Sequence, residues 1–313
     1  MDKGIELYLI SGALGAGKTT FLKRLLTESD GRKTGVLVNE FGVIGLDGKQ
    51  IDRDGISLVE INNGSIFCSC LKADFVKTLI EFSKSDIDVL FIENSGMADP
   101  SNIHTLLNEL EGKCSRKFLY QGAVCLLDAV TFPKFVSILR PVQNQVASSD
   151  FIVLNKIDLV NQDTLTDIEA KVHEINPKAF IYRTMFAEVP PEIMKERLID
   201  NGFVGETSNK EYNRPISYAL ESHELLTKVE VEAFAESMQP YLMRMKGFIK
   251  TQNGWLQLDM VDKFINISEI QLGKRDTIRN TKLVLIGPGP EEYRQFMENS
   301  WKKHCHGVLE VFE

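Results

Sequence analysis

Short apolar runs, each followed by a polar or glycine-rich turn, recur through the first two thirds of the chain. Such runs are typical of parallel strands buried on both faces. Segments with apolar residues three and four positions apart lie between several of them and predict amphipathic helices. The alternation predicts an α/β domain with a mainly parallel sheet. Its strands are expected at residues 5–10, 35–39, 57–61, 88–92, 123–128, 151–154 and 179–183, and its helices at 20–29, 74–85 and 132–139.

The pattern changes near residue 200. Residues 201–213 are rich in Gly, Ser, Asn and charge, which is typical of a linker. Beyond them, strands are expected at 216–220, 247–250, 255–258 and 281–286, with helices at 229–242 and 291–304. Asn253-Gly254 predicts a tight hairpin turn. We therefore expect a first domain over residues 1–200, a linker over 201–213, and a small α+β domain over 214–313.

The first apolar run leads into Gly12-Ala-Leu-Gly15-Ala-Gly17-Lys18-Thr19-Thr20. Its Gly-x4-Gly-Lys-Thr spacing predicts a phosphate-binding loop (P-loop), because glycines let consecutive backbone N–H groups wrap a polyphosphate. Lys18 is expected to reach the β- and γ-phosphates, and the Thr19 hydroxyl to ligate Mg²⁺. The N-terminus of the following helix adds partial positive charge. The sequence thus predicts a P-loop NTPase domain.

Two later segments are expected to face the γ-phosphate. The polar loop at residues 39–47 contains Glu40 and is a candidate switch, although a plain surface loop has a similar composition. Glu93 ends a predicted strand, where a P-loop enzyme keeps its second magnesium contact, and the Gly96 N–H is expected to approach the γ-phosphate. We assign Lys18, Glu93 and Glu40 to catalysis.

Asn155-Lys156-Ile157-Asp158 follows another predicted strand. An aspartate accepts two hydrogen bonds from the N1–H and exocyclic amine of guanine, whereas adenine offers neither in that geometry. The Lys156 stem can lie over the base, while Asn155 ties this loop to the P-loop. The arrangement predicts GTP and GDP as ligands rather than ATP.

Five cysteines, an odd number, indicate reduced thiols rather than a disulfide framework. Cys68 and Cys70 precede a predicted helix and would face the same side of an extended segment. Two thiols do not complete a structural zinc site. The pair is either a labile metal site completed by Glu40, water or another protein, or two half-buried thiols. His304-Cys305-His306 ends a predicted helix, where three adjacent residues cannot all face one ion.

At 313 residues, the chain is long enough for two domains. Its net charge of −8 argues against general nucleic-acid binding. No apolar run approaches the ~20 residues that span a membrane, and no signal-peptide pattern precedes the first strand. We expect a cytoplasmic protein without nucleic-acid or membrane partners.

These motifs resemble the CobW family of GTPases, metal-handling relatives of the UreG and HypB nickel chaperones. The resemblance extends to Ala98-Asp99-Pro100, Asn176-Pro177 and Lys246-Gly247-Phe248, and so covers nearly the whole chain. The family's metal motif is Cys-x-Cys-Cys after Asn-Gly. Here Ser65 and Phe67 occupy its first two cysteine positions, Cys68 matches the third, and Cys70 is an additional or displaced thiol.

The resemblance implies an Mg²⁺-dependent GTPase that uses its nucleotide cycle to deliver a transition metal, such as Zn²⁺ or Co²⁺, or to activate a metal- or corrinoid-dependent client. The implied partners are guanine nucleotide, a client metalloprotein and a second copy of the chain in a homodimer. The alternative is a regulatory or maturation GTPase that binds a client without carrying metal. A passive metal buffer with a vestigial P-loop is a third hypothesis.

Overall fold

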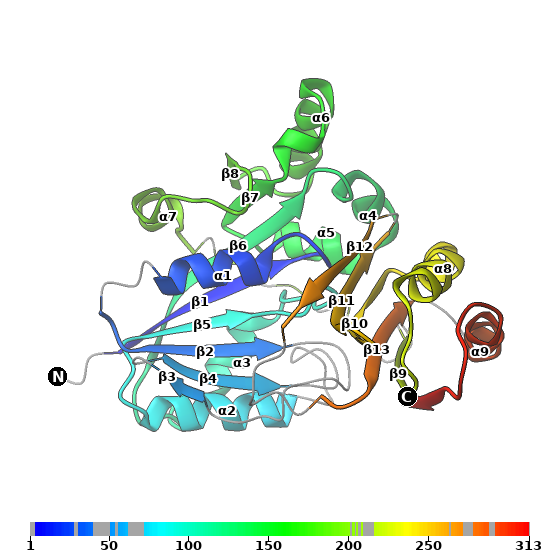
Figure 1. Ribbon diagram of the computed structural model, residues 1–313. Helices are drawn as coiled ribbons and strands as arrows, with labels where there is room; N and C mark the ends of the chain where they lie inside the picture. The colour runs from blue at the N-terminus through cyan, green and yellow to red at the C-terminus, as the bar shows by residue number, and fades with distance from the viewer. Residues whose placement is uncertain are drawn as a thin grey trace. The chain divides into compact units, whose positions relative to one another are not determined.

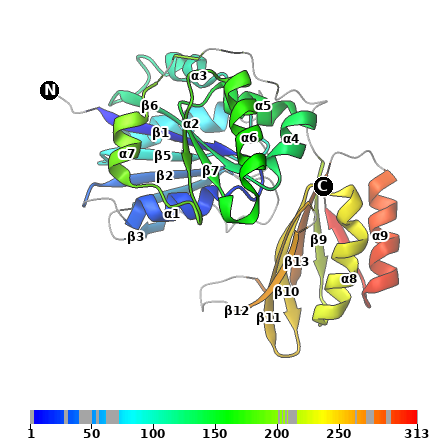
Figure 2. The same cartoon turned by 90° about the horizontal axis from the view of Figure 1, so that it is seen from above.

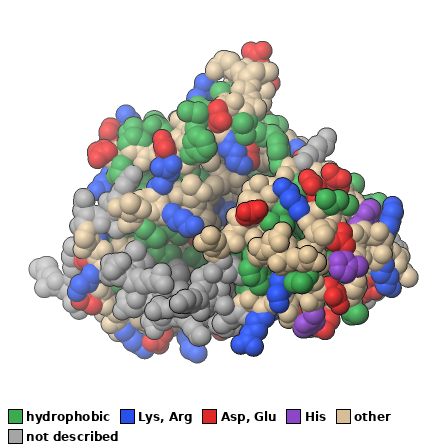
Figure 3. Space-filling model, viewed as in Figure 1, with side chains coloured by type: hydrophobic (Ala, Val, Ile, Leu, Met, Phe, Trp, Pro, Cys, Tyr) green, Lys and Arg blue, Asp and Glu red, His purple; other side chains and the backbone are tan. Residues whose placement is uncertain are grey.

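The computed structural model describes residues 4–27, 31–39, 51–53, 56–61, 72–200, 202–203, 205, 208, 216–262, 264–271, 278–287 and 292–312. Described residues up to 208 belong to one compact unit, and those from 216 onward belong to a second. Within these ranges, every helix is too short or too polar to traverse a lipid bilayer. Acidic and basic side chains are interspersed on the face shown in Figure 3.

The first unit is built on an eight-stranded sheet in the described residues. Its strands are β1 (Ile5–Gly12), β2 (Thr34–Asn39), β3 (Ile51–Arg53), β4 (Ile56–Ile61), β5 (Val89–Glu93), β6 (Phe118–Asp128), β7 (Phe151–Asn155) and β8 (Phe180–Arg183). They follow the order β3-β4-β2-β5-β1-β6-β7-β8 (Figure 1). Every pair is parallel except β3 with β4, so the expected mainly parallel sheet is confirmed.

Helices and one 3₁₀ turn connect these strands. They are α1 (Lys18–Thr27), α2 (Lys72–Lys84), α3 (Ile103–Glu109), α4 (Phe132–Ile138), α5 (Arg140–Ala147), η1 (Ile157–Leu159), α6 (Gln162–Ile175) and α7 (Pro191–Arg197). Helices lie on both sides of the sheet (Figure 2). One apolar cluster packs the sheet against α2 and α3, and another packs it against α1 and α7. The apolar strand runs are therefore buried on both faces, as their composition predicts.

The strand register places the polar ends of several strands together. Glu93 at the end of β5 pairs with Ile10 of β1, two residues before the first P-loop glycine. Asp128 at the end of β6 pairs with Asn155 at the end of β7. Since parallel strands end at the same edge, the loops that follow β1, β5, β6 and β7 gather at one edge of the sheet.

The second unit is an antiparallel sheet in the order β12-β11-β10-β13-β9-β14 among the described residues. Its elements are β9 (Ile216–Ser222), α8 (Lys228–Met238), η3 (Gln239–Tyr241), β10 (Arg244–Thr251), β11 (Gly254–Val261), β12 (Phe264–Ile270), β13 (Thr281–Gly287), α9 (Glu292–His304) and β14 (Glu310–Phe312). A hairpin joins β10 to β11 as the sequence predicts, but its turn is Gln252-Asn253, one residue earlier than expected, because Gly254 already pairs with Thr251. Strands β12 and β14 are additional to the predicted set.

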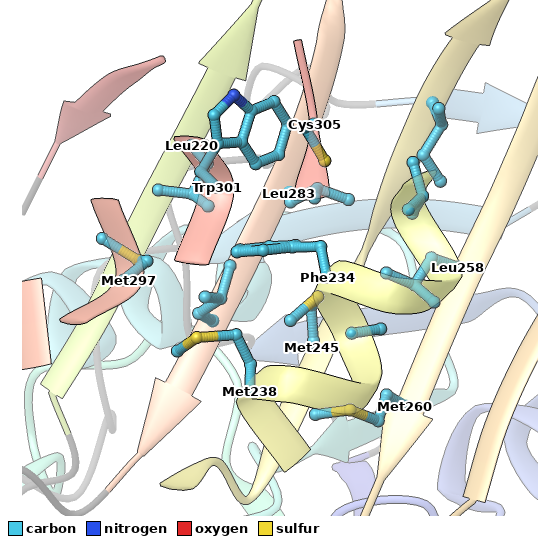
Figure 4. Close-up of a cluster of buried hydrophobic side chains, with 14 of the residues drawn as sticks. Leu220, Phe234, Met238, Met245, Leu258, Met260, Leu283, Met297, Trp301 and Cys305 are labelled. Carbon is cyan, nitrogen blue, oxygen red and sulfur yellow. The ribbon is translucent and has the colours of Figure 1, made fainter. Parts of the chain in front are cut away.

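The core of the second unit lies between this sheet and helices α8 and α9 (Figure 4). Phe234 of α8 meets Trp301 of α9 edge to face, with ring centroids 5.1 Å apart. Cys305 packs into the same cluster and is only 6% exposed. Burial raises the pKa of the Cys305 thiol to about 12, and the charge of Glu230 adds to this shift. The thiol of Cys305 is therefore a core group.

Candidate functional site

The loop between β1 and α1 has the backbone geometry of a phosphate cradle. Gly12, Gly15 and Gly17 all have positive φ angles, of 132°, 77° and 105°. A Cβ at Gly17 would lie 2.7 Å from Nδ2 of Asn155, so the position accepts only glycine without a shift. The Lys18 ammonium folds over this loop and donates to the carbonyl oxygens of Gly12 and Ala13, at 2.9 and 3.0 Å.

Thr19 and Glu93 bring two oxygen groups together beside the loop. The Thr19 hydroxyl donates to Oε1 of Glu93 at 2.7 Å, although the residues are 74 positions apart. Glu93 is 3% exposed, whereas Thr19 and the adjacent Thr20 are exposed in the first turn of α1. Hydroxyl and carboxylate oxygens are the donors that Mg²⁺ prefers, so this pair fits a magnesium site.

The loop after β5 lies against the P-loop. A Cβ on Gly96 would come within 2.6 Å of the Leu14 backbone nitrogen, so the two backbones are in close approach. The Gln145 side chain of α5 donates to the carbonyls of Gly96 and Ala98, at 3.3 and 2.8 Å. The sequence pattern missed α5, because buried Gln145 interrupts an apolar face made mainly by Val142 and Val146.

Asp99 fixes the far end of that loop. It is fully buried, and its carboxylate accepts hydrogen bonds from the Ser101 backbone and hydroxyl at 3.0 and 2.6 Å. The other carboxylate oxygen accepts from the Asn144 amide and the Ser208 hydroxyl, both at 2.6 Å. Asp99 thus joins the loop after β5 to α5 and to Ser208.

Asn155 connects three loops. Its Nδ2 donates to the Ala16 carbonyl in the P-loop at 3.0 Å. Its Oδ1 accepts from the Ala187 backbone N–H at 2.9 Å. The side chain is 3% exposed, and both of its polar atoms are hydrogen-bonded. The predicted tie between Asn155 and the P-loop is present in the structure.

The loop after β8 was not predicted as part of the site. Phe186 and Ala187 have φ angles of 53° and 57°, a region that non-glycine residues rarely adopt. Arg24 of α1 holds the loop by donating to the Phe186 carbonyl at 3.0 Å and by pairing with Glu188 at 2.9 Å. Strained backbone of this kind persists where surrounding contacts fix it, often at ligand sites. The sequence gives no sign of it, because none of these residues is a glycine.

Lys156 and Asp158 follow β7. Lys156 also has a left-handed backbone, with φ 60° and ψ 37°, and its ammonium lies 2.6 Å from Oδ2 of Asp128. Asp158 is exposed in the 3₁₀ turn η1. An exposed carboxylate beside a fixed lysine stem is a suitable arrangement for recognising the edge and face of a base.

The proposed transition-metal residues Glu40, Cys68 and Cys70 lie outside the described residues, as does most of the candidate switch at 39–47. Within the described ranges, no three His, Cys, Asp or Glu side chains are grouped to hold a metal ion. Burial raises the pKa of Cys125 to about 12, although hydrogen bonds with Ser11 and Ser149 act to lower it. Cys125 is a core thiol, in agreement with its place in an apolar strand.

Comparison with protein families gives two matches. Residues 6–183 match the CobW/HypB/UreG nucleotide-binding domain. Residues 216–303 match the cobalamin synthesis protein CobW C-terminal domain. The first match alone covers more than half of the chain and contains the P-loop, Glu93, Gly96 and the Asn155–Asp158 motif.

Individual relatives share a third or less of their aligned residues with this chain. The zinc chaperone YjiA of Escherichia coli is 33% identical over 190 residues, which cover 59% of this chain and 59% of YjiA. The zinc-regulated GTPase metalloprotein activator 1 of Dictyostelium discoideum is 29% identical over 63% of this chain and 49% of its own length. The crystal structure of Zn(II)-bound YjiA GTPase aligns over 98% of this chain and 100% of its own, with 25% identity and a TM-score of 0.49. The chain thus spans about half to three fifths of the two curated relatives.

Proposed function

Because the chain belongs to the CobW/HypB/UreG family, we propose that it is a Mg²⁺-dependent GTP hydrolase that couples its nucleotide cycle to the handling of a transition metal. The observation that carries the nucleotide half of this proposal is the junction at Asn155. One side chain joins the P-loop, the base-recognition motif and the loop after β8 through two hydrogen bonds. This junction supports a single site in which the P-loop binds phosphates and the Asn155–Asp158 loop recognises guanine.

Each nucleotide-site residue receives a role from its position. The backbone of Gly12, Gly15 and Gly17, with the Lys18 ammonium, would bind the β- and γ-phosphates. Bound Mg²⁺ would neutralise charge on the phosphate oxygens, held by Thr19 directly and by Glu93 through water. The Gly96 N–H lies in a loop pressed against the P-loop and is suited to contact the γ-phosphate.

The base end has its own assignments. Asp158 would accept hydrogen bonds from the guanine edge, while the Lys156 stem covers the face of the base. Asn155 would fix the position of both residues relative to the P-loop through its hydrogen bond to the Ala16 carbonyl. Guanine selectivity therefore follows from an acceptor pair that adenine cannot satisfy.

The proposed role in metal handling rests on the similarity to zinc-handling relatives and on the spacing of the cysteines. YjiA is a zinc chaperone, and the Dictyostelium relative is a zinc-regulated activator of metalloproteins. We extend that role to this chain, with Cys68, Cys70 and Glu40 as ligands for Zn²⁺ or Co²⁺ and a metalloprotein as client. A homodimer would supply further ligands from a second copy. The competing proposal is a GTPase that binds a client without carrying metal.

The test is GTP turnover measured with Mg²⁺ alone and with added Zn²⁺, Co²⁺ or Ni²⁺, alongside metal analysis of the purified protein. We expect the chain to hydrolyse GTP but not ATP. We also expect metal bound to the purified protein and a rate of GTP turnover that changes when one of these ions is added. If the purified protein contains no bound metal and its rate of GTP turnover is unchanged by all three ions, the client-binding GTPase would be favoured. Absence of any GTP turnover would contradict both.

A further inference from the structure

We propose that Asp128, which no sequence motif singles out, is a positioning residue for nucleotide specificity. It holds the Lys156 side chain, before the nucleotide binds, in the position where the lysine stem covers the base. This inference rests on the proposed function, since it concerns how that site binds guanine. The two residues lie on neighbouring strand ends, because Asp128 of β6 pairs in register with Asn155 of β7.

The contact is well defined on both sides. The Lys156 ammonium lies 2.6 Å from Oδ2 of Asp128, and the other carboxylate oxygen accepts the Val130 N–H at 2.9 Å. The Asp128 side chain is 4% exposed, while that of Lys156 is 35% exposed. A buried carboxylate held at both oxygens therefore anchors the tip of a partly exposed lysine.

The backbone supports the same geometry. Lys156 is one of the few non-glycine residues with positive φ among the described residues. The strand ends are also held together, since the Ala129 N–H donates to the Asn155 carbonyl at 3.0 Å. The side chain of Lys156 consequently turns toward β6 and is tethered there, with Asp158 two residues further along the chain.

The tether matters because a free lysine side chain has many rotamers. Immobilising such a side chain costs binding affinity, and preorganisation removes that cost. The ion pair with Asp128 orders the Lys156 stem before the nucleotide arrives. A guanine base can then lie against the stem without ordering it, although Asp128 itself does not touch the nucleotide.

This assignment predicts a base-specific defect. Losing the tether should weaken GDP binding by roughly 5- to 30-fold, the factor that corresponds to lysine rotamer entropy. Binding of inorganic tripolyphosphate, which lacks a base, should not change. A general disturbance of the site would instead weaken both ligands.

The experiment measures the dissociation constant of a fluorescent GDP analogue, and its displacement by GDP or tripolyphosphate, for the full chain and three variants. Asp128→Asn keeps an acceptor for the Val130 N–H but removes the charge. Lys156→Met keeps an apolar stem but removes the tethered ammonium. The double variant completes a mutant cycle.

We expect each single variant to lose the predicted affinity for GDP, with tripolyphosphate unaffected. Adding Asp128→Asn to Lys156→Met should change GDP affinity by less than about two-fold, because the tether is already gone. Asp128→Glu should recover part of the lost affinity. If Asp128→Asn does not fold, Lys156→Met still provides the test, since full GDP affinity in that variant overturns the proposal.

Three further results would overturn it: unchanged GDP affinity in Asp128→Asn, equal weakening of GDP and tripolyphosphate, or an undiminished effect of Asp128→Asn in the Lys156→Met background. These results differ from failure of the proposed function, in which the wild-type chain itself does not bind the GDP analogue. In that case, both the function and the inference fail.

Discussion

The hydroxyl of Thr19 and the carboxylate of Glu93 are joined by a 2.7 Å hydrogen bond, linking the first turn of α1 to the end of β5. The P-loop helix and the neighbouring strand thereby present their oxygen groups to one point. Such contacts orient the group that ligates a metal directly.

Replacing Glu93 by Gln should weaken Mg²⁺ binding, so that half-maximal GTP hydrolysis requires a higher Mg²⁺ concentration. The substitution keeps the size of the side chain but removes the charge beside Thr19, and loss of such a supporting group typically costs about 10- to 100-fold in metal affinity or activity. Turnover across a Mg²⁺ titration measures the effect. Glu81→Gln, at an exposed position on α2, is the control. Superimposable Mg²⁺ curves for Glu93→Gln and wild type would contradict the magnesium assignment.

Base selection should change in Asp158→Asn. An Asn at this position turns one acceptor into a donor, so guanine loses a partner and xanthine gains one. The cost in GTP binding should be roughly 1–3 kcal/mol, the penalty for leaving a polar group unpaired. Competition of GTP, XTP and ATP for the site measures the change, with exposed Asp163→Asn as control. GTP affinity that is unaltered, with ATP competing equally, would make the Asn155–Asp158 motif a coincidence.

Metal affinity should depend on the bound nucleotide. If Cys68 and Cys70 form a metal site near the switch, Zn²⁺ affinity should differ between the GTP-analogue and GDP states by about 1–3 kcal/mol, and linkage requires metal to change nucleotide affinity by the same factor. The double Cys→Ser variant should lose this difference while retaining basal nucleotide binding. Titration of Zn²⁺ and Co²⁺ into each state measures it. Equal affinities in the two states would favour the client-binding GTPase.

The second unit should show a pH-dependent contribution to stability from His306 and Glu230. The Glu230 contact raises the pKa of His306 above 6.5. Burial raises the pKa of Glu230, but hydrogen bonds from Thr227 and His306 outweigh it and lower the value to about 2. The histidine contribution is complete below pH 6.5 and is lost as the pH rises through the raised pKa. The glutamate contribution is complete above pH 4.5 and is lost as the pH falls toward 2.

The pair should therefore stabilise the fold most between about pH 4.5 and 6.5. Because His306 is exposed, we expect His306→Gln to cost less than about 1 kcal/mol. Urea unfolding of wild type and variant at pH 5.5 and pH 9 measures the difference, which should shrink at the higher pH. His304→Gln is the neighbouring control. A difference that grows with pH would contradict the assignment.

The parts of the site that could be predicted are those carried by contiguous motifs. Gly12 to Thr19 and Asn155 to Asp158 each encode their chemistry within a few residues, and apolar runs placed Glu93 at a strand end. Asp128 and Gln145 could not be found in this way, because their roles depend on strand register and helix packing between segments distant in the chain.

The elements of the fold that could be predicted are likewise those whose own composition carries the signal. Buried parallel strands have nearly continuous apolar sequences and were predictable. Helix α5 was missed, because its buried face includes Gln145. The edge strands β12 and β14 were missed as well, because their residues are all exposed or half-buried and do not form a continuous buried apolar run. Edge strands depend on pairing with a neighbour more than on their own composition.

The most direct test of the central claim is the rate of GTP hydrolysis in Mg²⁺ buffer for wild type, Lys18→Ala and Lys23→Ala. Lys18 folds over the P-loop, whereas Lys23 is an exposed lysine on the same helix. In the proposed site, the Lys18 charge would stabilise the phosphates, where electrostatic stabilisation contributes most to catalysis. The account predicts that Lys18→Ala abolishes turnover and weakens nucleotide binding, while Lys23→Ala matches wild type. Undiminished turnover in Lys18→Ala would contradict the assignment of this site as the GTP-hydrolysing centre.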